Sequence, residues 1–217
     1  MSLFKIYGMY KSCYNGGTFA KQDSRTLVTS KTSERVRQLL PIDILSRLPK
    51  VQESSTSSAA PSLFVMINSS LWDLSDGCND QVGVTSKYAK LYETGIIELH
   101  NAIQETFTLR GYIHFAIYWR TSPPVSMTYD IQTTLRGNGR IRSNQNELNI
   151  ILKDTVTQND LGIVIDWSKQ ILNGNVSEQI LSNMLGTDGR HYNKESSLAF
   201  VNLWLNDIFN RYYQKER

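Results

Sequence analysis

Short apolar runs alternate with helical stripes of apolar residues from residue 62 to the end of this chain. Each run is bounded by polar or small residues and is typical of a buried strand; the runs cover 62–70, 112–119 and 161–168. Helices are expected between and after them, over 85–110, 138–156 and 194–214. This alternation predicts an α/β fold with a parallel sheet and right-handed crossovers.

The helical stripes also predict which side chains face the core. In the first helix Thr85 or Ser86 is the expected cap, and the expected apolar face comprises Tyr88, Leu91, Tyr92, Ile96, Leu99 and Ile103. In the last helix the residues expected on or near the apolar face are Leu198, Val201, Leu203, Trp204 and Phe209.

The first sixty residues carry weaker patterns. Residues 4–10 fit a short strand, and a helical spacing that follows is broken at Pro41. The segment 52–62 is rich in serine and has no apolar periodicity, so we expect a flexible loop. With 217 residues, the chain is long enough for one domain with a substantial core, which we expect to span 1–217.

Charge and composition narrow the classes of partner. The net charge is +3 and the basic residues are scattered, apart from Arg136, Arg140 and Arg142, so we expect no nucleic-acid partner.

No apolar run approaches the roughly 18–20 residues of a membrane span, and the start lacks the apolar segment of a signal peptide. Two cysteines form neither a disulfide framework nor a metal quartet, so the cytosol or the nucleus is the expected compartment.

The predicted sheet places particular residues at one edge. In open parallel sheets the ligand site lies at the carboxyl ends of the strands. That rule selects Asn68–Asp73, Trp119–Ser122, and Asp166 with Trp167.

Three of these side chains have chemistry suited to a site. The amide of Asn68 can donate to a developing oxyanion, or else it satisfies loop backbone groups. Arg120 can bind a carboxylate or a phosphate, or else it is a structural residue. Trp72 is either a pocket wall or part of the core.

The segment "TDGRHYN", 187–193, places Asp188 three residues before His191. On a tight loop the acid can reach the imidazole Nδ1, fix its tautomer and leave Nε2 to accept a proton. The alternative is a polar Asp-Gly turn followed by a surface histidine, which is the more common meaning of such an isolated motif.

Together, three segments in this order resemble the SGNH (GDSL-like) hydrolase superfamily, and most closely its PC-esterase branch, over residues 62–206. "INSSLWDLSDG", 67–77, is similar to the N-S-x-x-W-D-L-S signature of that branch. "YWRTSPP", 118–124, is similar to its W-x-T-x-P-P segment, and "TDGRHYN" to the D-G-x-H block that supplies the acid and the base.

The resemblance implies a three-layer α/β/α sandwich with a flavodoxin-like sheet. It implies hydrolysis or transfer of acyl groups through a Ser–His–Asp triad with no metal or other cofactor. His191 would be the general base, Asp188 its orienting partner and Asn68 an oxyanion donor. "YNGGTF" resembles the H-N-G segment of the branch, which makes Gly16 a candidate second donor.

The sequence departs from the superfamily at its front, because it contains no G-D-S. Either the nucleophile-bearing strand is missing from this chain, or the chain is a divergent member that has lost the nucleophile. Ser12 and Cys13 follow a possible strand, so one of them is the candidate substitute.

Two functions therefore remain open: an acyl esterase acting on small-molecule or glycan esters, and an inactive SGNH-like binding protein. A nucleotide-binding protein is disfavoured, because "RGNGR", 136–140, follows no predicted strand and lacks the Lys-Ser/Thr of a P-loop.

Overall fold

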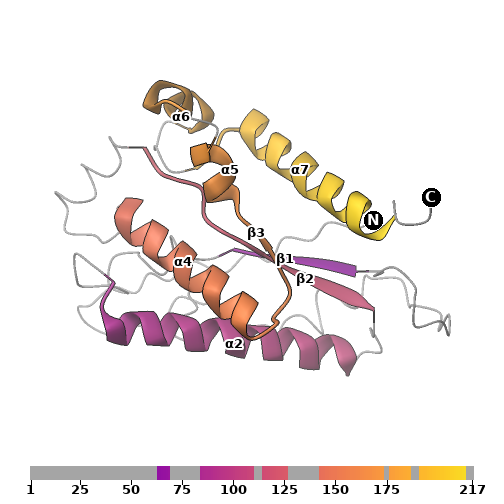
Figure 1. Cartoon of the computed structure of the whole chain (residues 1–217). Coiled ribbons are helices and arrows are strands. Elements are labelled where there is room, and N and C mark those ends of the chain that lie inside the picture. The colour runs from indigo at the N-terminus through magenta and orange to yellow at the C-terminus, as the bar shows by residue number, and fades with distance from the viewer. Residues whose placement is uncertain are drawn as a thin grey trace, which may run out of the picture.

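The computed structural model describes residues 63–68, 84–109, 114–126, 142–173, 176–186 and 191–213. All three strands and all three helices expected from residue 62 onward are present, together with two short helices that the sequence patterns did not indicate. In chain order (Figure 1) the elements are β1 (Leu63–Ile67), α2 (Ser86–Thr108), β2 (Phe115–Arg120), α4 (Arg142–Gln158), β3 (Ile163–Ile165), α5 (Trp167–Asn173), α6 (Glu178–Met184) and α7 (Lys194–Tyr212).

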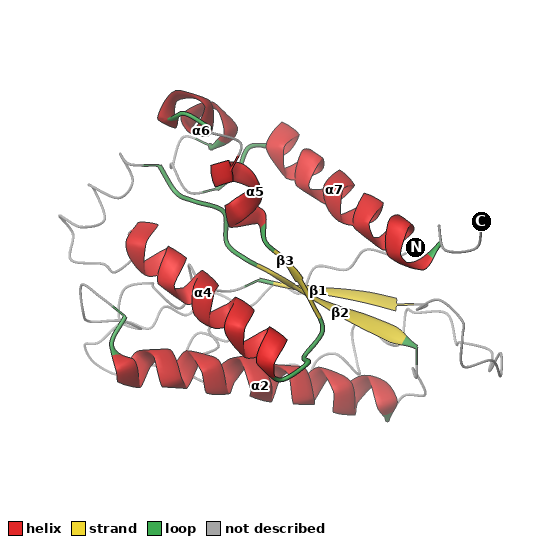
Figure 2. Ribbon diagram, in the orientation of Figure 1, coloured by secondary structure: helices red, strands yellow, loops and turns green. Residues whose placement is uncertain are grey.

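The described strands form a parallel sheet in the order β1-β2-β3 (Figure 2). Its register pairs Ile67 with Trp119, and Arg120 with Ile165. Figure 1 shows α2 and α4 covering one face of the sheet, while α5 and α7 lie over the other. The predicted α/β fold with a parallel sheet and three layers is therefore confirmed.

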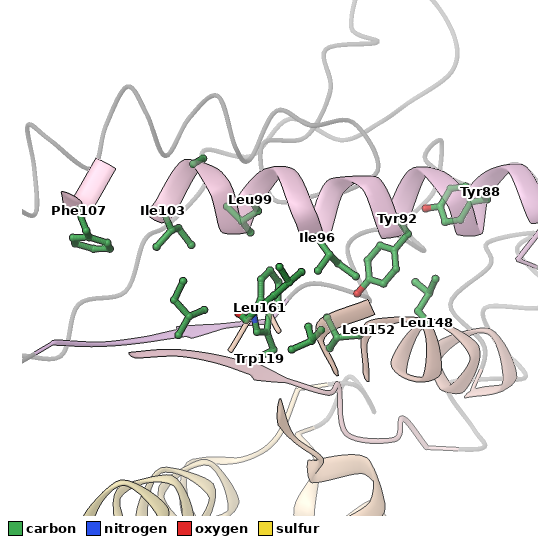
Figure 3. Close-up of a cluster of buried hydrophobic side chains, with 13 residues drawn as sticks. Tyr88, Tyr92, Ile96, Leu99, Ile103, Phe107, Trp119, Leu148, Leu152 and Leu161 are labelled. Atoms are coloured by element: carbon green, nitrogen blue, oxygen red, sulfur yellow. Dashed lines mark hydrogen bonds between the residues drawn. The ribbon is translucent and has the colours of Figure 1, made fainter. Parts of the chain in front are cut away.

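The layer between the sheet and α2/α4 is a continuous apolar core. Figure 3 shows Tyr92, Ile96 and Leu99 projecting from α2 toward Trp119 of β2 and Leu152 of α4, and all five are buried. Each fully buried side chain of this size contributes about 1.5–3 kcal/mol by leaving water. The α2 cap is Thr85, whose hydroxyl accepts from the Tyr88 N–H at 3.2 Å, as expected.

The opposite face of the sheet packs against aromatic residues. Tyr118, which alternates with Trp119 along β2, meets Trp204 of α7 edge-on, with ring centroids 6.0 Å apart. Phe200, Trp204 and Ile208 recur every four residues and are the buried residues of α7. Because successive residues of a strand point to opposite faces, one short strand serves both cores.

A glycine lets β3 approach β2 closely. Gly162, immediately before β3, has φ +124°, a conformation that only glycine adopts easily. A Cβ at this position would lie 2.4 Å from the backbone oxygen of Ile117. The entry into β3 therefore requires both the conformational freedom and the small size of glycine.

The third strand is shorter than the sequence pattern predicted. Only Ile163–Ile165 is strand. Asp166 accepts from the Lys169 N–H at 3.0 Å and so begins α5, which includes Trp167 and Ser168. A continuous apolar run does not distinguish a buried strand from a strand followed by a buried helix, and the predicted extent 161–168 was wrong for this reason.

Part of each predicted apolar face was also wrong. Leu91 of α2 is 41% exposed, and three predicted members of the α7 face, Leu198, Leu203 and Phe209, are about half exposed. On α7 the buried side is instead defined by Phe200 and Ile208, on either side of Trp204. When the apolar stripe of a helix is wider than the part of the helix that packs against the sheet, the residues at the edges of the stripe stay exposed to solvent.

The expected loop 52–62 and the first sixty residues lie outside the described part of the chain, so the predictions made for them remain predictions. Within the described ranges, no helix combines the length and the apolar character needed to cross a bilayer.

Candidate functional site

The carboxyl ends of the three strands lie side by side, as a parallel sheet requires. Asn68 follows β1 and its Nδ2 donates to the Arg120 backbone oxygen at 3.1 Å. Thr121 follows β2, and its N–H donates to the Ile165 oxygen at 3.1 Å. Its hydroxyl donates to Asp166 Oδ1, also at 3.1 Å. Three segments that are distant in sequence therefore meet at one edge.

Asn68 acts as a bridge between β1 and the segment after β2. Besides the Arg120 oxygen, its Nδ2 donates to Ser122 Oγ at 3.0 Å. A side-chain amide has two N–H donors, so both are engaged. For Asn68 to serve as the predicted oxyanion donor, a substrate oxygen must replace one of these two acceptors.

Trp119 does not belong to this edge. Its side chain is fully buried in the layer under α2 and α4, where Nε1 donates to the Leu161 oxygen at 2.9 Å. The strand-end rule selected a residue whose side chain faces the core, because the rule gives the position along a strand and not the face.

Residues 121–126 are buried although they form no strand or helix. Asn149 of α4 binds Ser122 twice: its Oδ1 accepts from the Ser122 N–H at 2.9 Å and its Nδ2 donates to the Ser122 oxygen at 2.8 Å. One turn earlier, Gln145 Nε2 donates to the Pro123 oxygen at 2.6 Å. These amides replace the ladder hydrogen bonds that the segment lacks.

Sequence reasoning missed this pair of amides, although a signal was present. Gln145 and Asn149 alternate with Leu148 and Leu152 at positions i, i+3, i+4 and i+7, which is the inward-facing stripe of a helix. Polar side chains in such a stripe are buried and therefore need partners. Buried amides at Gln145 and Asn149 therefore indicate that α4 packs against a backbone segment that needs hydrogen-bond partners.

The turn that carries His191 is closed by backbone hydrogen bonds. The Gly186 N–H donates to the His191 oxygen at 2.6 Å, and the Asn193 N–H donates to the Met184 oxygen at 2.9 Å. Asn193 also caps α7, because its Oδ1 accepts from the Ser196 N–H at 2.9 Å. His191 is exposed, and its backbone oxygen is the acceptor that pairs with Gly186.

Tyr192 ties the turn to the strand-end segment. Its hydroxyl donates to the Pro124 oxygen at 3.0 Å, and the centroid of its ring lies 5.1 Å from the centroid of the Phe200 ring. Burial raises the pKa of the Tyr192 hydroxyl far above its usual range, so it remains a neutral donor. The tether therefore joins the residue after His191 to the buried segment that follows β2.

Arg120 lies on an aromatic surface beside the same tether. Its guanidinium carbon is 4.3 Å from the centroid of the Trp167 ring. Trp167 is in turn stacked on Phe200, with centroids 4.5 Å apart and an interplanar angle of 22°. Burial lowers the pKa of Arg120 to about 10, against a smaller opposing effect of Tyr192.

Of the predicted site residues, the structure joins Asn68 to the backbone oxygen of Arg120, and it joins Tyr192, the residue after His191, to the Pro124 oxygen. Four others, Ser12, Gly16, Trp72 and Asp188, lie outside the described residues, as does Cys13. Among the residues that the structure describes, no three His, Cys, Asp or Glu side chains form a group that could hold a metal ion.

Comparison with models of known protein families gives no match. A search of curated protein sequences also gives none. Among solved structures, the chain is similar to the lipase/acylhydrolase from Enterococcus faecalis. The similarity has a TM-score of 0.51 at 16% sequence identity and covers 89% of this chain and 75% of that one. The chain therefore shares a fold with an acylhydrolase.

Proposed function

We propose that this chain is an acyl esterase of the SGNH (GDSL-like) superfamily, in its PC-esterase branch. The observation that supports this best is the tether from Tyr192 to Pro124, because it joins the residue after His191 to the segment that follows β2. The described residues of the three segments that resemble the superfamily are linked by hydrogen bonds, from Asn68 to Ser122 and from Tyr192 to Pro124. The fold shared with a lipase/acylhydrolase supports the same chemistry.

In the proposed mechanism His191 is the general base. It takes the proton of a serine hydroxyl as that oxygen attacks the ester carbonyl, and it then protonates the leaving alcohol. Asp188 orients the imidazole, Ser12 is the candidate nucleophile, and Gly16 and Asn68 are the candidate oxyanion donors. Water releases the acyl group in a second round of the same steps. The proposed substrate is a small-molecule or glycan ester in the cytosol or the nucleus, and no cofactor takes part.

Hydrolysis of p-nitrophenyl acetate tests the role of His191. We expect His191→Ala to lower kcat/KM about 10²–10⁴-fold, because a positioned general base contributes that much. His114→Ala is the matched control, since His114 precedes β2 and lies at the opposite edge of the sheet. An equal loss in both variants, or none in His191→Ala, would remove the proposed base.

The nucleophile is tested separately. Labelling with a fluorophosphonate, followed by peptide mass spectrometry, identifies a serine that the base activates. We expect the label at Ser12, with loss of labelling in Ser12→Ala and in His191→Ala. A label elsewhere would reassign the nucleophile, and no label together with no hydrolysis would exclude the serine mechanism.

The hydrogen bonds of Asn68 favour a second candidate function. Because both amide hydrogens are already bound within the protein, the residue is suited to a fixed structural bridge. In that case the chain is an SGNH-like binding protein without catalysis. Such a protein would bind an ester analogue as well in His191→Ala as in the wild type, and would hydrolyse none.

A further inference from the structure

Arg120 is a cation at the carboxyl edge of the sheet without a counter-charge in the described structure. Its Nε is fully buried and has no hydrogen-bond partner. The contact that holds its guanidinium is the ring face of Trp167, 4.3 Å away. No carboxylate of the described residues lies within ion-pair distance of it. A contact on the ring face leaves the Nη hydrogens of the guanidinium available to oxygen acceptors.

Arg142 shows how a partly buried arginine of the same region is satisfied. Its Nη1 lies 2.6 Å from Glu178 Oε1, and its Nε donates to the Val125 oxygen at 3.0 Å. Arg211 of α7 likewise pairs with Asp207 at 2.6 Å. Among these three arginines, Arg120 is the one without an acidic partner in the described part of the chain.

The Arg120 guanidinium is therefore suited to an anionic partner that is not part of the described chain. Arg120 is half-buried, but its Nε has left water without gaining a hydrogen bond, a cost that a cation–π contact does not offset and that an anion held by the guanidinium would reduce. The planar fork of arginine matches the two oxygens of a carboxylate or a phosphate. Titratable groups perturbed by burial at the ligand-binding edge of a sheet are also more common in functional sites than elsewhere.

We propose that Arg120 binds an anionic group, a carboxylate or a phosphate, on the ligand of this site. The identity of that ligand as an ester rests on the proposed function. The ring of Trp167, itself stacked on Phe200, holds the guanidinium, and the Asn68 bond to the Arg120 oxygen fixes its backbone. The anionic end of the ligand binds here, while the acyl group to be cleaved extends toward His191.

Binding of simple anions tests this without turnover. The probes are inorganic phosphate and succinamate, with neutral succinamide as the control for shape, measured by isothermal titration calorimetry at constant ionic strength. We expect phosphate or succinamate to bind the wild type, succinamide to bind at least tenfold more weakly, and Arg120→Met to lose the preference for the anion. Arg120→Lys should retain part of it, because it keeps the charge and loses the fork.

Arg211→Met is the matched control, since Arg211 is a paired arginine on α7 and should not affect anion binding. If Arg120→Met does not fold, the wild type alone still decides. We expect succinamate to raise its Tm more than succinamide does at equal concentration and ionic strength, a comparison that does not depend on the general stabilisation of proteins by phosphate. Anions that bind Arg120→Met as tightly as the wild type, or that fail to bind or stabilise the wild type at all, would overturn the proposal.

The two proposals fail separately. A chain that binds phosphate through Arg120 but hydrolyses no ester keeps the anion site and loses the esterase function. A chain that hydrolyses p-nitrophenyl acetate through His191 but prefers no anion keeps the esterase function and loses the anion site.

Discussion

The α2/α4 side of the sheet and its carboxyl edge are held by different forces. Under α2 and α4, side chains such as Ile96 and Leu148 are fully buried against one another and against β2. At the edge, the side chains of Asn68, Gln145 and Asn149 instead form hydrogen bonds with backbone groups and with Ser122. The helix α4 takes part in both regions, because Leu148 and Asn149 are neighbours in its sequence.

This difference corresponds to what each region must fix. Apolar burial is non-directional, so it holds the layers together without prescribing one loop conformation. Residues 121–126 are buried without strand or helix, and their backbone conformation must come from directional bonds. The polar edge therefore positions Arg120 and Tyr192, while the apolar layer supplies stability. Three substitutions test this division.

The largest effect is expected from Leu148→Ala in the apolar layer. Removing a fully buried leucine side chain leaves a cavity, and we expect the free energy of unfolding to fall by about 2–5 kcal/mol in urea denaturation. Ile150→Ala on the same helix is the control, because Ile150 is 53% exposed and should cost under about 0.5 kcal/mol. Equal losses at the two positions would contradict the packing of α4.

A smaller loss with a different signature is expected from Asn149→Leu. The substitution keeps the volume but leaves the Ser122 N–H and oxygen without their partner, which costs about 1–3 kcal/mol. Unlike Leu148→Ala, it should also weaken anion binding at Arg120 in calorimetry, because it releases the adjoining segment. Asn146→Leu, at a half-buried position of the same helix, is the control. Unchanged stability in Asn149→Leu would show that the segment is held in another way.

The two regions also differ in how far the sequence predicts them. The order of strands and helices follows from apolar periodicity, because burial of the α2/α4 layer imposes it directly on residues such as Ile96 and Leu99. The short helices α5 and α6 were missed, since a helix of seven residues is too short to show a period. The exposed margin of α7 was misjudged because the sequence does not give the width of the surface it covers.

At the site, sequence reasoning selected Asn68, Arg120 and His191, and their joint role stays a prediction. It did not foresee that the Asn68 amide is engaged by Ser122, or that Tyr192 ties the His191 turn to Pro124. Both are contacts between residues more than fifty positions apart. Their formation depends on the register of the sheet, which local patterns do not specify.

The smallest effect concerns Asp166, at the border between the two regions. Burial alone would raise its pKa, but the hydrogen bond and charge of Lys153, the Lys169 N–H and the Thr121 hydroxyl together hold the pKa below its usual value. A carboxylate with a lowered pKa stabilises the folded state above the unfolded pKa of about 3.9 and loses this contribution as the pH falls through the folded pKa. Asp166→Asn keeps the α5 cap without the charge, so we expect a loss of about 0.5–1 kcal/mol near pH 7 that disappears once the pH is below the lowered folded pKa. Asp207→Asn, which removes the more exposed pair with Arg211, is the control and should cost less and depend more on salt. Parallel stability curves for wild type and Asp166→Asn from pH 7 to pH 2 would show that charge at Asp166 does not join the sheet edge to α4.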